Sequence, residues 1–423
     1  MKFIICLLLF LPLMASGTAL KVDTTITKNA QNEWVLSYKT SAAIERLVLK
    51  RSPDNSRIIR WRPVADNFVV SLEHGKEIIR RKDLARFTQV RLYLTPSYTS
   101  LAKDYSPFSP FSDGAMLIHT GRFFACANLC TEYDNSWNMT IISEQNDLII
   151  VNGEGYLAQH SWLDKDDGQK VYIGSTAAIE NEDFVAVIDR QLPSVLREAL
   201  EGQLPEMMAF FTKKLDKLKF KPTLFASYSD LDDGSYGNQG GTLPNQVFMH
   251  WYGKKAISAL NEFQVSWFFA HEIAHLFQRK AANISVIEQQ WIHEGGADFM
   301  AYQLLNSLGG EYRKYANERL TTDTNSCLKQ TIDKSFSSLI INENYQVLYQ
   351  CGVLFWEMIA RDEYVLANKV NIFDIWTAFN SEVESGSPAN FSTFKNVLRP
   401  NVTEKTFNRI LQYLEFRASD HKR

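Results

Sequence analysis

His271-Glu272-Ile273-Ala274-His275 is the stretch that decides the fold, together with Glu294, which follows after eighteen intervening residues. Residues four apart lie on one face of an α-helix, so both imidazoles can reach a single metal ion while Glu272 projects beside it. A catalytic zinc takes three protein ligands and keeps a fourth position for water, and two histidines with one glutamate are a known ligand set. We therefore expect His271, His275 and Glu294 to bind one Zn²⁺ per chain and Glu272 to act as the general base.

Two helices are predicted to carry these residues. Apolar residues around the histidines indicate a helix from about Asn261 to Arg279, and a second apolar set indicates a helix that begins near Trp291. Asp298 lies one turn after Glu294 on the second helix, where a carboxylate can accept the other ring N–H of a ligating histidine and fix its tautomer. His293 is either an alternative ligand or a residue packed beside the metal. Core packing and a helix dipole could also explain these residue types, but half of the chain's eight histidines cluster in this region.

The spacing of the histidines, Glu272, Glu294 and the following acid resembles that of the gluzincin metallopeptidases. It is most similar to the aminopeptidase N-like branch, which has a thermolysin-like catalytic domain and hydrolyses peptide bonds. In that branch a tyrosine of a Y-x-x-G segment stabilises the tetrahedral intermediate, and Tyr349-Gln350-Cys351-Gly352 stands here where a helical pattern begins. The resemblance makes Tyr349 the expected oxyanion donor, with Tyr345 as its nearest competitor.

One segment departs from the pattern of that family. Its aminopeptidases carry a G-A-M-E-N segment whose glutamate binds the free amino terminus of the substrate, whereas the corresponding segment here, Gly240 to Trp251, contains no acid. Gly240 and Gly241 are candidates for substrate binding, although a plain turn before an edge strand is the other explanation. Alternation from Val247 to Trp251 predicts a strand whose exposed backbone could pair with a bound peptide. Internal cleavage is therefore favoured over removal of amino-terminal residues, unless an acid of the preceding loop supplies the anchor: Asp230, Asp232 or Asp233.

The amino terminus predicts export. Met1-Lys2, the apolar run from Phe3 to Met14 and the small residues up to Ala19 are typical of a secretory signal peptide over residues 1–19. No other segment approaches the roughly 18 apolar residues of a transmembrane helix, so a secreted or periplasmic protein is expected. A net charge of −3 without a basic stripe gives no electrostatic footprint for nucleic acid.

Four cysteines remain after the predicted signal peptide, and an even number suits disulfides in an oxidising compartment. Proximity favours a bond between Cys126 and Cys130, which leaves Cys327 to pair with Cys351. A zinc site made from these cysteines is the other possibility.

The chain is long enough for two domains, and the predicted fold class is α+β. Residues 20–190 show short alternating strands separated by turn residues, which indicates a β-sandwich-like domain similar to the amino-terminal β-domain of the same family. Residues 191–423 are expected to form the gluzincin-like catalytic domain, mostly helical with a small sheet. Its first elements are predicted as helices at Val195–Leu200 and Pro205–Leu218 and a strand at Lys221–Ser229. The chain ends where that family begins a large helical carboxy-terminal domain, so a more open cleft is expected.

These observations predict an exported zinc metallopeptidase that acts on a peptide or protein substrate. An aminopeptidase, a zinc hydrolase of a non-peptide bond and a zinc-retaining binding module without turnover are the alternatives. The presence of Glu272 argues against the binding module, because a zinc site without turnover has no use for that base. The oligomeric state is left open.

Overall fold

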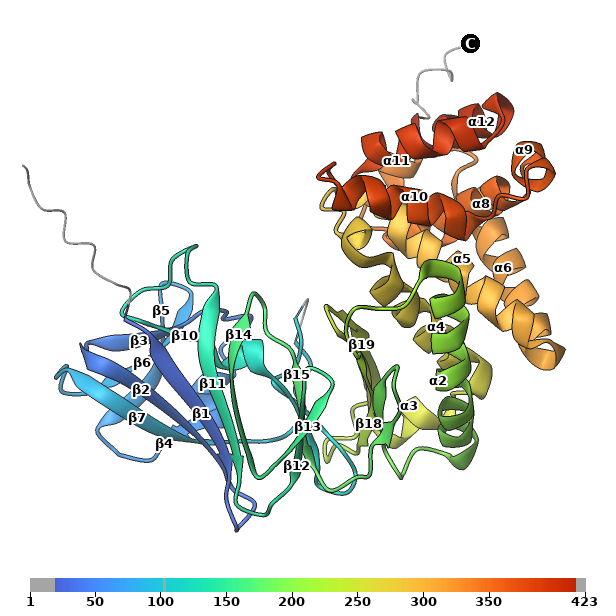
Figure 1. The fold of residues 1–423 in the computed structure, drawn as a ribbon. Coiled ribbons are helices and arrows are strands. Elements are labelled where there is room, and N and C mark those ends of the chain that lie inside the picture. Colours follow the sequence, from blue (N-terminus) through green and yellow to red (C-terminus); the bar gives the residue numbers. More distant parts are fainter. Residues whose placement is uncertain (1–19, 102–103, 416–423) are drawn as a thin grey trace, which may run out of the picture.

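The computed structural model describes residues 20–101 and 104–415, and it consists of a β-rich amino-terminal half and a mostly helical carboxy-terminal half (Figure 1). This arrangement confirms the predicted α+β class with its small carboxy-terminal sheet. The predicted signal peptide lies outside the described residues. No helix within residues 20–101 and 104–415 combines the length and the apolarity needed to cross a membrane.

Three sheets build the amino-terminal half, in the strand orders β14-β11-β1-β2-β7-β4, β10-β3-β6-β5 and β13-β12-β15-β9-β8. Alternation of side chains explains how these strands pack, because every second residue of β1 is buried in the core while the residues between them are exposed or half-buried. The strands are β1 Val22–Lys28, β2 Trp34–Ile44, β3 Arg46–Leu49, β4 Trp61–Pro63, β5 Phe68–Glu73, β6 Lys76–Arg81, β7 Phe87–Leu94, β8 Phe108–Pro110, β9 Met116–His119, β10 Ala125–Ala127, β11 Ser136–Ser143, β12 Leu148–Val151, β13 Glu154–Leu157, β14 Gln159–Lys165 and β15 Lys170–Gly174.

A fourth sheet belongs to the carboxy-terminal half and has the order β16-β17-β18-β20-β19. Its strands are β16 Ile179–Glu180, β17 Val185–Ile188, β18 Thr223–Ser229, β19 Gly237–Leu243 and β20 Gln246–Tyr252. β17 lies within the residues 20–190 that were expected to form the β-sandwich-like domain, but it pairs with β16 and β18 in this fourth sheet. The division of the chain at residue 190 stays a prediction.

The sheet corrects one expectation about the substrate strand. β20 includes the strand predicted from Val247 to Trp251, but it hydrogen-bonds to β18 on one side and to β19 on the other. Its backbone is therefore not exposed, and that expectation was wrong. The free edge belongs to β19, which carries Gly240 and Gly241. Apolar alternation does not predict this strand, because it consists largely of glycines and polar residues.

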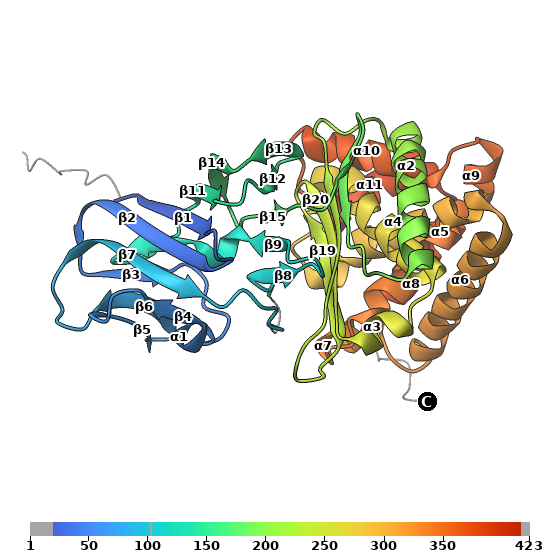
Figure 2. The same ribbon diagram turned by 90° about the horizontal axis from the view of Figure 1, so that it is seen from below.

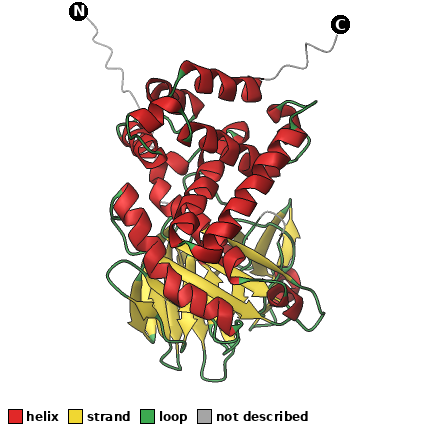
Figure 3. Ribbon diagram, turned by 90° about the vertical axis from the view of Figure 1, so that its right-hand side faces the viewer, coloured by secondary structure: helices red, strands yellow, loops and turns green. Residues whose placement is uncertain are grey.

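Helices cover one face of this sheet, as Figure 2 shows for α2 and α4, and Figure 3 shows the helices in front of and above the strands. The larger helices are α2 Ser194–Leu215, α4 Glu262–Gln278, α5 Trp291–Leu308, α6 Gly310–Gln330, α8 Gln346–Ala360, α10 Ile372–Glu384, α11 Phe391–Leu398 and α12 Glu404–Glu415. The shorter ones are α1 Arg57–Arg60, α3 Lys254–Ser258, α7 Phe336–Ile341 and α9 Glu363–Ala367.

The first of these helices corrects a second expectation. α2 runs through Pro205 without interruption, whereas the sequence predicted a break before that residue. Proline removes one backbone hydrogen bond of a helix, but α2 buries seven side chains on one face: Leu196, Leu200, Leu204, Met207, Met208, Phe211 and Leu215. Packing of that face outweighs the local penalty.

Each half of the chain contains one disulfide bond, and neither bond links the two halves. Cys126 is bonded to Cys130 beside β10, and Cys327 of α6 is bonded to Cys351 of α8. All four cysteines are consumed by these bonds, which excludes the alternative of a zinc site built from them.

Candidate active site

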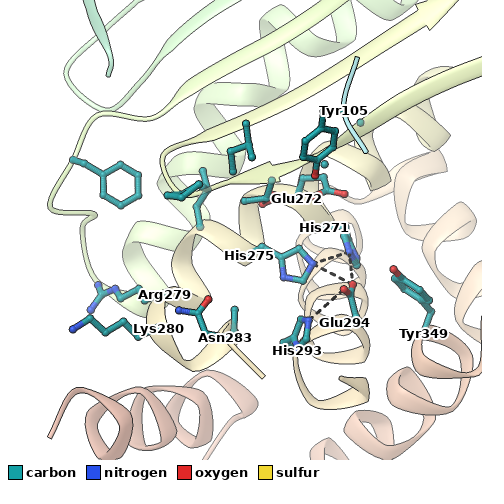
Figure 4. Close-up of a pocket in the computed structure, with 18 residues that line it drawn as sticks. Tyr105, His271, Glu272, His275, Arg279, Lys280, Asn283, His293, Glu294 and Tyr349 are labelled. Atoms are coloured by element: carbon teal, nitrogen blue, oxygen red, sulfur yellow. Dashed lines mark hydrogen bonds and ion pairs between the residues drawn. The ribbon is translucent and has the colours of Figure 1, made fainter. Parts of the chain in front are cut away.

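The predicted pair of helices exists and places the candidate metal-binding residues in the core. α4 begins with a capping box in which the Asn261 side chain accepts a hydrogen bond from Gln264 N (2.9 Å) and the Gln264 side chain accepts one from Asn261 N (3.4 Å). The rings of His271 and His275, one turn apart, lie 4.7 Å apart between centroids. α5 packs against α4 and brings Glu294 to the same point (Figure 4).

Three ligand atoms converge there. Nε2 of His271 and Nε2 of His275 are 3.0 Å apart, and each lies 3.3 Å from Oε2 of Glu294. One ligand atom from each of the three side chains lies within 4.8 Å of the others.

The outer ring nitrogens define the tautomers. Nδ1 of His271 faces Asp298 Oδ1 at 2.9 Å, and Nδ1 of His275 faces Gln278 Oε1 at 2.7 Å. Both facing atoms are acceptors, so each neutral ring carries its proton on Nδ1 and turns the lone pair of Nε2 inward. In their neutral forms the two imidazoles thus direct their Nε2 lone pairs toward each other and toward a carboxylate oxygen of Glu294. A cation is the group that satisfies this arrangement, and the donor set suits zinc.

The charges around the site lead to the same conclusion. Burial opposes ionisation of Glu294, but the three neighbouring histidines outweigh it and hold the pKa of Glu294 well below its usual range. Burial likewise opposes a charge on His271, yet Asp298 and Glu294 raise the pKa of His271 well above its ordinary value. The buried carboxylates of Glu294 and Asp298 therefore stabilise a positive charge between them, either a bound cation or a proton on His271.

Asp298 and Gln278 hydrogen-bond to the rings of the two candidate ligands, His271 and His275. Asp298 Oδ1 accepts from Trp267 Nε1 (2.8 Å) as well as from His271, and Gln278 Nε2 donates to the carbonyl oxygen of His293 (2.9 Å). His293 lies beside this group of three candidate ligands, with its Nε2 3.3 Å from the second oxygen of Glu294.

Tyr349 reaches the site from the first turn of α8. Its ring centroid lies 5.8 Å from that of His271. Burial, followed by the charges of Glu294, Asp298 and Glu272, raises the pKa of Tyr349 far above its ordinary value, so the hydroxyl keeps its proton and can donate. Tyr345, the competitor, is 41% exposed and does not line the cleft.

Two glycines allow α8 to come this close. A Cβ on Gly295 would stand 2.3 Å from Cα of Gly352, so α5 and α8 touch through their backbones. Nε1 of Trp356 also donates to the carbonyl oxygen of Ile292 at 3.0 Å. This contact sets the distance between Tyr349 on α8 and Glu294 on α5.

A cleft of about 700 Å³ opens over the site and runs along β19. Gly240 and Gly241 line it, and the next residue, Thr242, donates from Oγ1 to Glu272 Oε2 at 2.7 Å. At one end Tyr105 of the amino-terminal half enters the cleft, and a Cβ on Gly241 would lie 3.0 Å from its hydroxyl (Figure 4). Glu272 and Glu294 are the only acids among the described residues that line this cleft; Asp230, Asp232 and Asp233 do not.

Sequence reasoning missed three of these contacts. Gln278 follows His275 by three residues on the same helix face and could have been found by the spacing used for the ligands. Thr242 and Tyr105 could not, since their positions depend on how β19 lies against α4 and on how the two halves pack.

Neither a protein-family model nor a curated protein matches the chain. Its fold is similar to that of an M1 zinc metallopeptidase from Deinococcus radiodurans, solved as a glutamate-to-alanine mutant with a Tyr-Ser-Ala substrate, with a TM-score of 0.52, 11% identity and 94% of each chain covered. A two-domain M1 zinc metallopeptidase mutant bound to L-tryptophan gives a TM-score of 0.50, 11% identity and 94% of each chain covered. Native yeast LTA4 hydrolase gives a TM-score of 0.48 at 12% identity, over 92% of this chain and 65% of that one. At such low identity the first two similarities define the fold alone, which is that of the M1 zinc metallopeptidases.

Proposed function

We propose that this chain is an exported zinc metallopeptidase that hydrolyses peptide bonds. The observation that carries the proposal is the convergence of two imidazole lone pairs and Glu294 beside Glu272, at the floor of a cleft with a free strand edge. The M1 neighbour with a bound tripeptide supports a peptide substrate. The two disulfides and the predicted signal peptide support a secreted or periplasmic location.

Each residue has a role that follows from its position. His271, His275 and Glu294 would hold Zn²⁺, with Asp298 and Gln278 fixing the ring orientations. Zinc in such a site acidifies a water molecule and polarises a carbonyl group. Glu272 would accept the proton of the attacking water and pass it to the leaving amine. Tyr349 would donate a hydrogen bond to the developing oxyanion, which is worth about 3 kcal/mol in comparable sites.

We further propose that internal cleavage is favoured over release of amino-terminal residues. An aminopeptidase needs an anion for the free amino group, and the two acids in the cleft are already engaged, Glu272 with Thr242 and Glu294 with the histidines. The free edge of β19 offers backbone groups that can pair with an extended peptide from either direction.

Metal analysis and one substitution test the proposal. The purified protein should contain close to one zinc per chain. Glu272→Gln should retain that zinc and lose hydrolysis of a random peptide library, whereas Glu294→Ala should lose the metal. Mass spectrometry of the library and elemental analysis of each variant supply the measurements. Absence of zinc uptake by the parent protein would sink the proposal, and so would full activity of Glu272→Gln.

Acetylation of the substrate tests the mode of cleavage. A peptide that the protein cleaves should be cut at a similar rate when its amino terminus is acetylated, because the described residues of the cleft include no unengaged acid that could bind the free amine. If acetylation stops the reaction and products appear one residue at a time from that end, the protein is an aminopeptidase.

A further inference from the structure

One end of the catalytic cleft carries positive charge, which the metal motif does not account for. Arg279 and Lys280 line the cleft beyond His275, together with Asn283 and the apolar side chains of Phe220 and Leu276 (Figure 4). Tyr105 and Tyr349 lie toward the opposite end, and the candidate metal ligands lie between the two. A substrate bound beside the candidate metal ligands can therefore extend toward Tyr105 and Tyr349 at one end of the cleft and toward the two cations at the other.

The chain takes an unusual turn to present these two cations. α4 ends at Gln278, and Arg279 has a φ of 54° and a ψ of −139°, a conformation that residues other than glycine rarely adopt. On an uninterrupted helix, side chains of consecutive residues diverge by about 100°. The turn instead lets Arg279 and Lys280 line one cleft. Backbone strain beside a catalytic site indicates a functional constraint.

The two cations differ in how they are held. Nη2 of Arg279 donates to the carbonyl oxygen of Leu215 at 3.0 Å, and its Nη1 lies 3.9 Å from Glu384 Oε1, so the guanidinium is fixed and partly compensated. Lys280 is exposed and forms no ion pair with any residue in the described part of the chain. Among the residues that the structure describes, no acid lines this end of the cleft, since Glu272 and Glu294 lie at the proposed catalytic centre. Positive charge at this end is thus available to a bound anion.

We propose that Arg279 and Lys280 form a carboxylate-binding subsite, so that the protein prefers peptides with a negative charge at this end of the cleft; the inference rests on the proposed peptidase function. The planar guanidinium, fixed by Leu215, can bind a carboxylate with little loss of side-chain entropy, and Lys280 adds a mobile point charge. Phe220 and Leu276 contact the apolar part of the same substrate residue. Either a carboxy-terminal carboxylate or an aspartate or glutamate side chain supplies the required anion.

Paired peptide pools distinguish these two sources. One pair differs by a single glutamate or glutamine at a fixed position, and the other by a free or amidated carboxy terminus. The parent protein should cleave the charged member of at least one pair up to about fivefold faster in kcat/KM, the upper end of the effect expected of a solvent-exposed charge pair. Preference in the first pair identifies a side chain, and preference in the second identifies the terminus.

Charge reversal at Lys280 tests the assignment. Because Arg279 also donates to Leu215, its substitution could disturb folding, so Lys280→Glu is the informative variant. It should abolish the preference for the anionic member and favour a lysine in its place, while zinc content and Tm stay at parental values. The matched control is Lys39→Glu on the exposed face of β2, which should behave like the parent. If the parent shows no preference in either pair, or if Lys280→Glu keeps it, the inference is wrong.

A binding measurement separates this outcome from failure of the proposed function. The zinc-treated Glu272→Gln protein is equilibrated with the same pools, and retained peptides are quantified by mass spectrometry. Retention of the anionic members without any cleavage by the parent refutes the peptidase proposal and upholds the subsite. If the parent cleaves both members of each pair equally well and the Glu272→Gln protein retains them equally well, the peptidase proposal is upheld and the subsite is refuted.

Discussion

Glu272 is held by a side chain that its own motif does not contain. Thr242 Oγ1 lies 2.7 Å from Glu272 Oε2 and 2.8 Å from the main-chain oxygen of the same residue, so its single hydroxyl proton is shared between these two acceptors. The contact ties the proposed base to the strand along which a peptide would lie. Thr242 is therefore a positioning residue in the proposed reaction rather than a group that contacts the reacting atoms.

Thr242→Val should lower kcat about tenfold and leave KM nearly unchanged. Valine keeps the shape of the side chain but removes the hydrogen bond to a charged group, which is worth about 1.5–3 kcal/mol. Thr242→Ser keeps the hydroxyl and should retain most of the activity. Steady-state kinetics on a peptide cleaved by the parent supply the measurement. A rise in KM at constant kcat would instead assign Thr242 to substrate binding.

The sequence alone predicted which site residues lie close together wherever a single helix determines their geometry. The four-residue spacing places His271 and His275 on one face whatever the rest of the chain does, and the next turn of α5 places Asp298 near Glu294 in the same way. Thr242 and Tyr105 reach the site from other elements, so their contacts depend on long-range packing that local periodicity does not encode.

The crossing of α5 and α8 is the element-scale feature on which the site depends. Gly295 and Gly352 meet backbone to backbone, and these helices carry Glu294 and Tyr349 respectively. The disulfide between Cys327 and Cys351 joins α8 to α6 immediately beside this crossing. A change at the crossing should therefore affect both the stability of the fold and the position of Tyr349, the proposed oxyanion donor.

Gly352→Ala should lower the free energy of unfolding by about 1–3 kcal/mol, as expected for overpacking of a tight contact. The added Cβ would lie 2.7 Å from Cα of Gly295 and 2.8 Å from the carbonyl oxygen of Trp291, and backbone atoms cannot move aside cheaply. kcat should fall as well, because α8 shifts and takes Tyr349 with it.

Gly202→Ala on α2 is the matched control for that substitution. Its Cβ would meet no atom within 4 Å, so the variant should be neutral or up to about 1 kcal/mol more stable. Urea unfolding and steady-state kinetics measure both variants. Equal stability of Gly352→Ala and the parent would contradict the close crossing.

Secondary structure could be predicted from the sequence where the apolar pattern was strong. The prediction failed where tertiary packing determines whether an element forms. The apolar periodicity of α4 and α5 located both helices. Pro205 suggested a break that the buried face of α2 overrides. β19 has no alternation because glycines and polar residues form it, so its place at the sheet edge follows only from its pairing with β20.

The two halves of the molecule meet around a buried lysine. Lys170 of β15 is fully buried, and its backbone exchanges hydrogen bonds of 2.7 and 2.6 Å with the Gln246 side chain of β20. Its Nζ lies 4.7 Å from the ring centroid of Phe248 and within 3.3 Å of Ser106 O and Ser109 Oγ. No carboxylate pairs with it among the described residues. Nothing in the sequence around Lys170 predicts this environment, because the surrounding residues come from both halves.

Replacement of this lysine should change how stability depends on pH. Burial, and then the nearby charge of Arg122, lower the pKa of Lys170 to about 7 in the folded protein, whereas a lysine of the unfolded chain titrates near about 10.4. Between these values the unfolded state binds more protons, so Lys170 makes stability rise with pH, by at most about 1.4 kcal/mol per pH unit. Lys170→Met keeps the contact with Phe248 and removes the titrating group, so its Tm should rise less than that of the parent between about pH 7 and 9. Calorimetry of both proteins at matched zinc content measures the difference, and parallel Tm curves across this range would show that Lys170 stays protonated inside the fold.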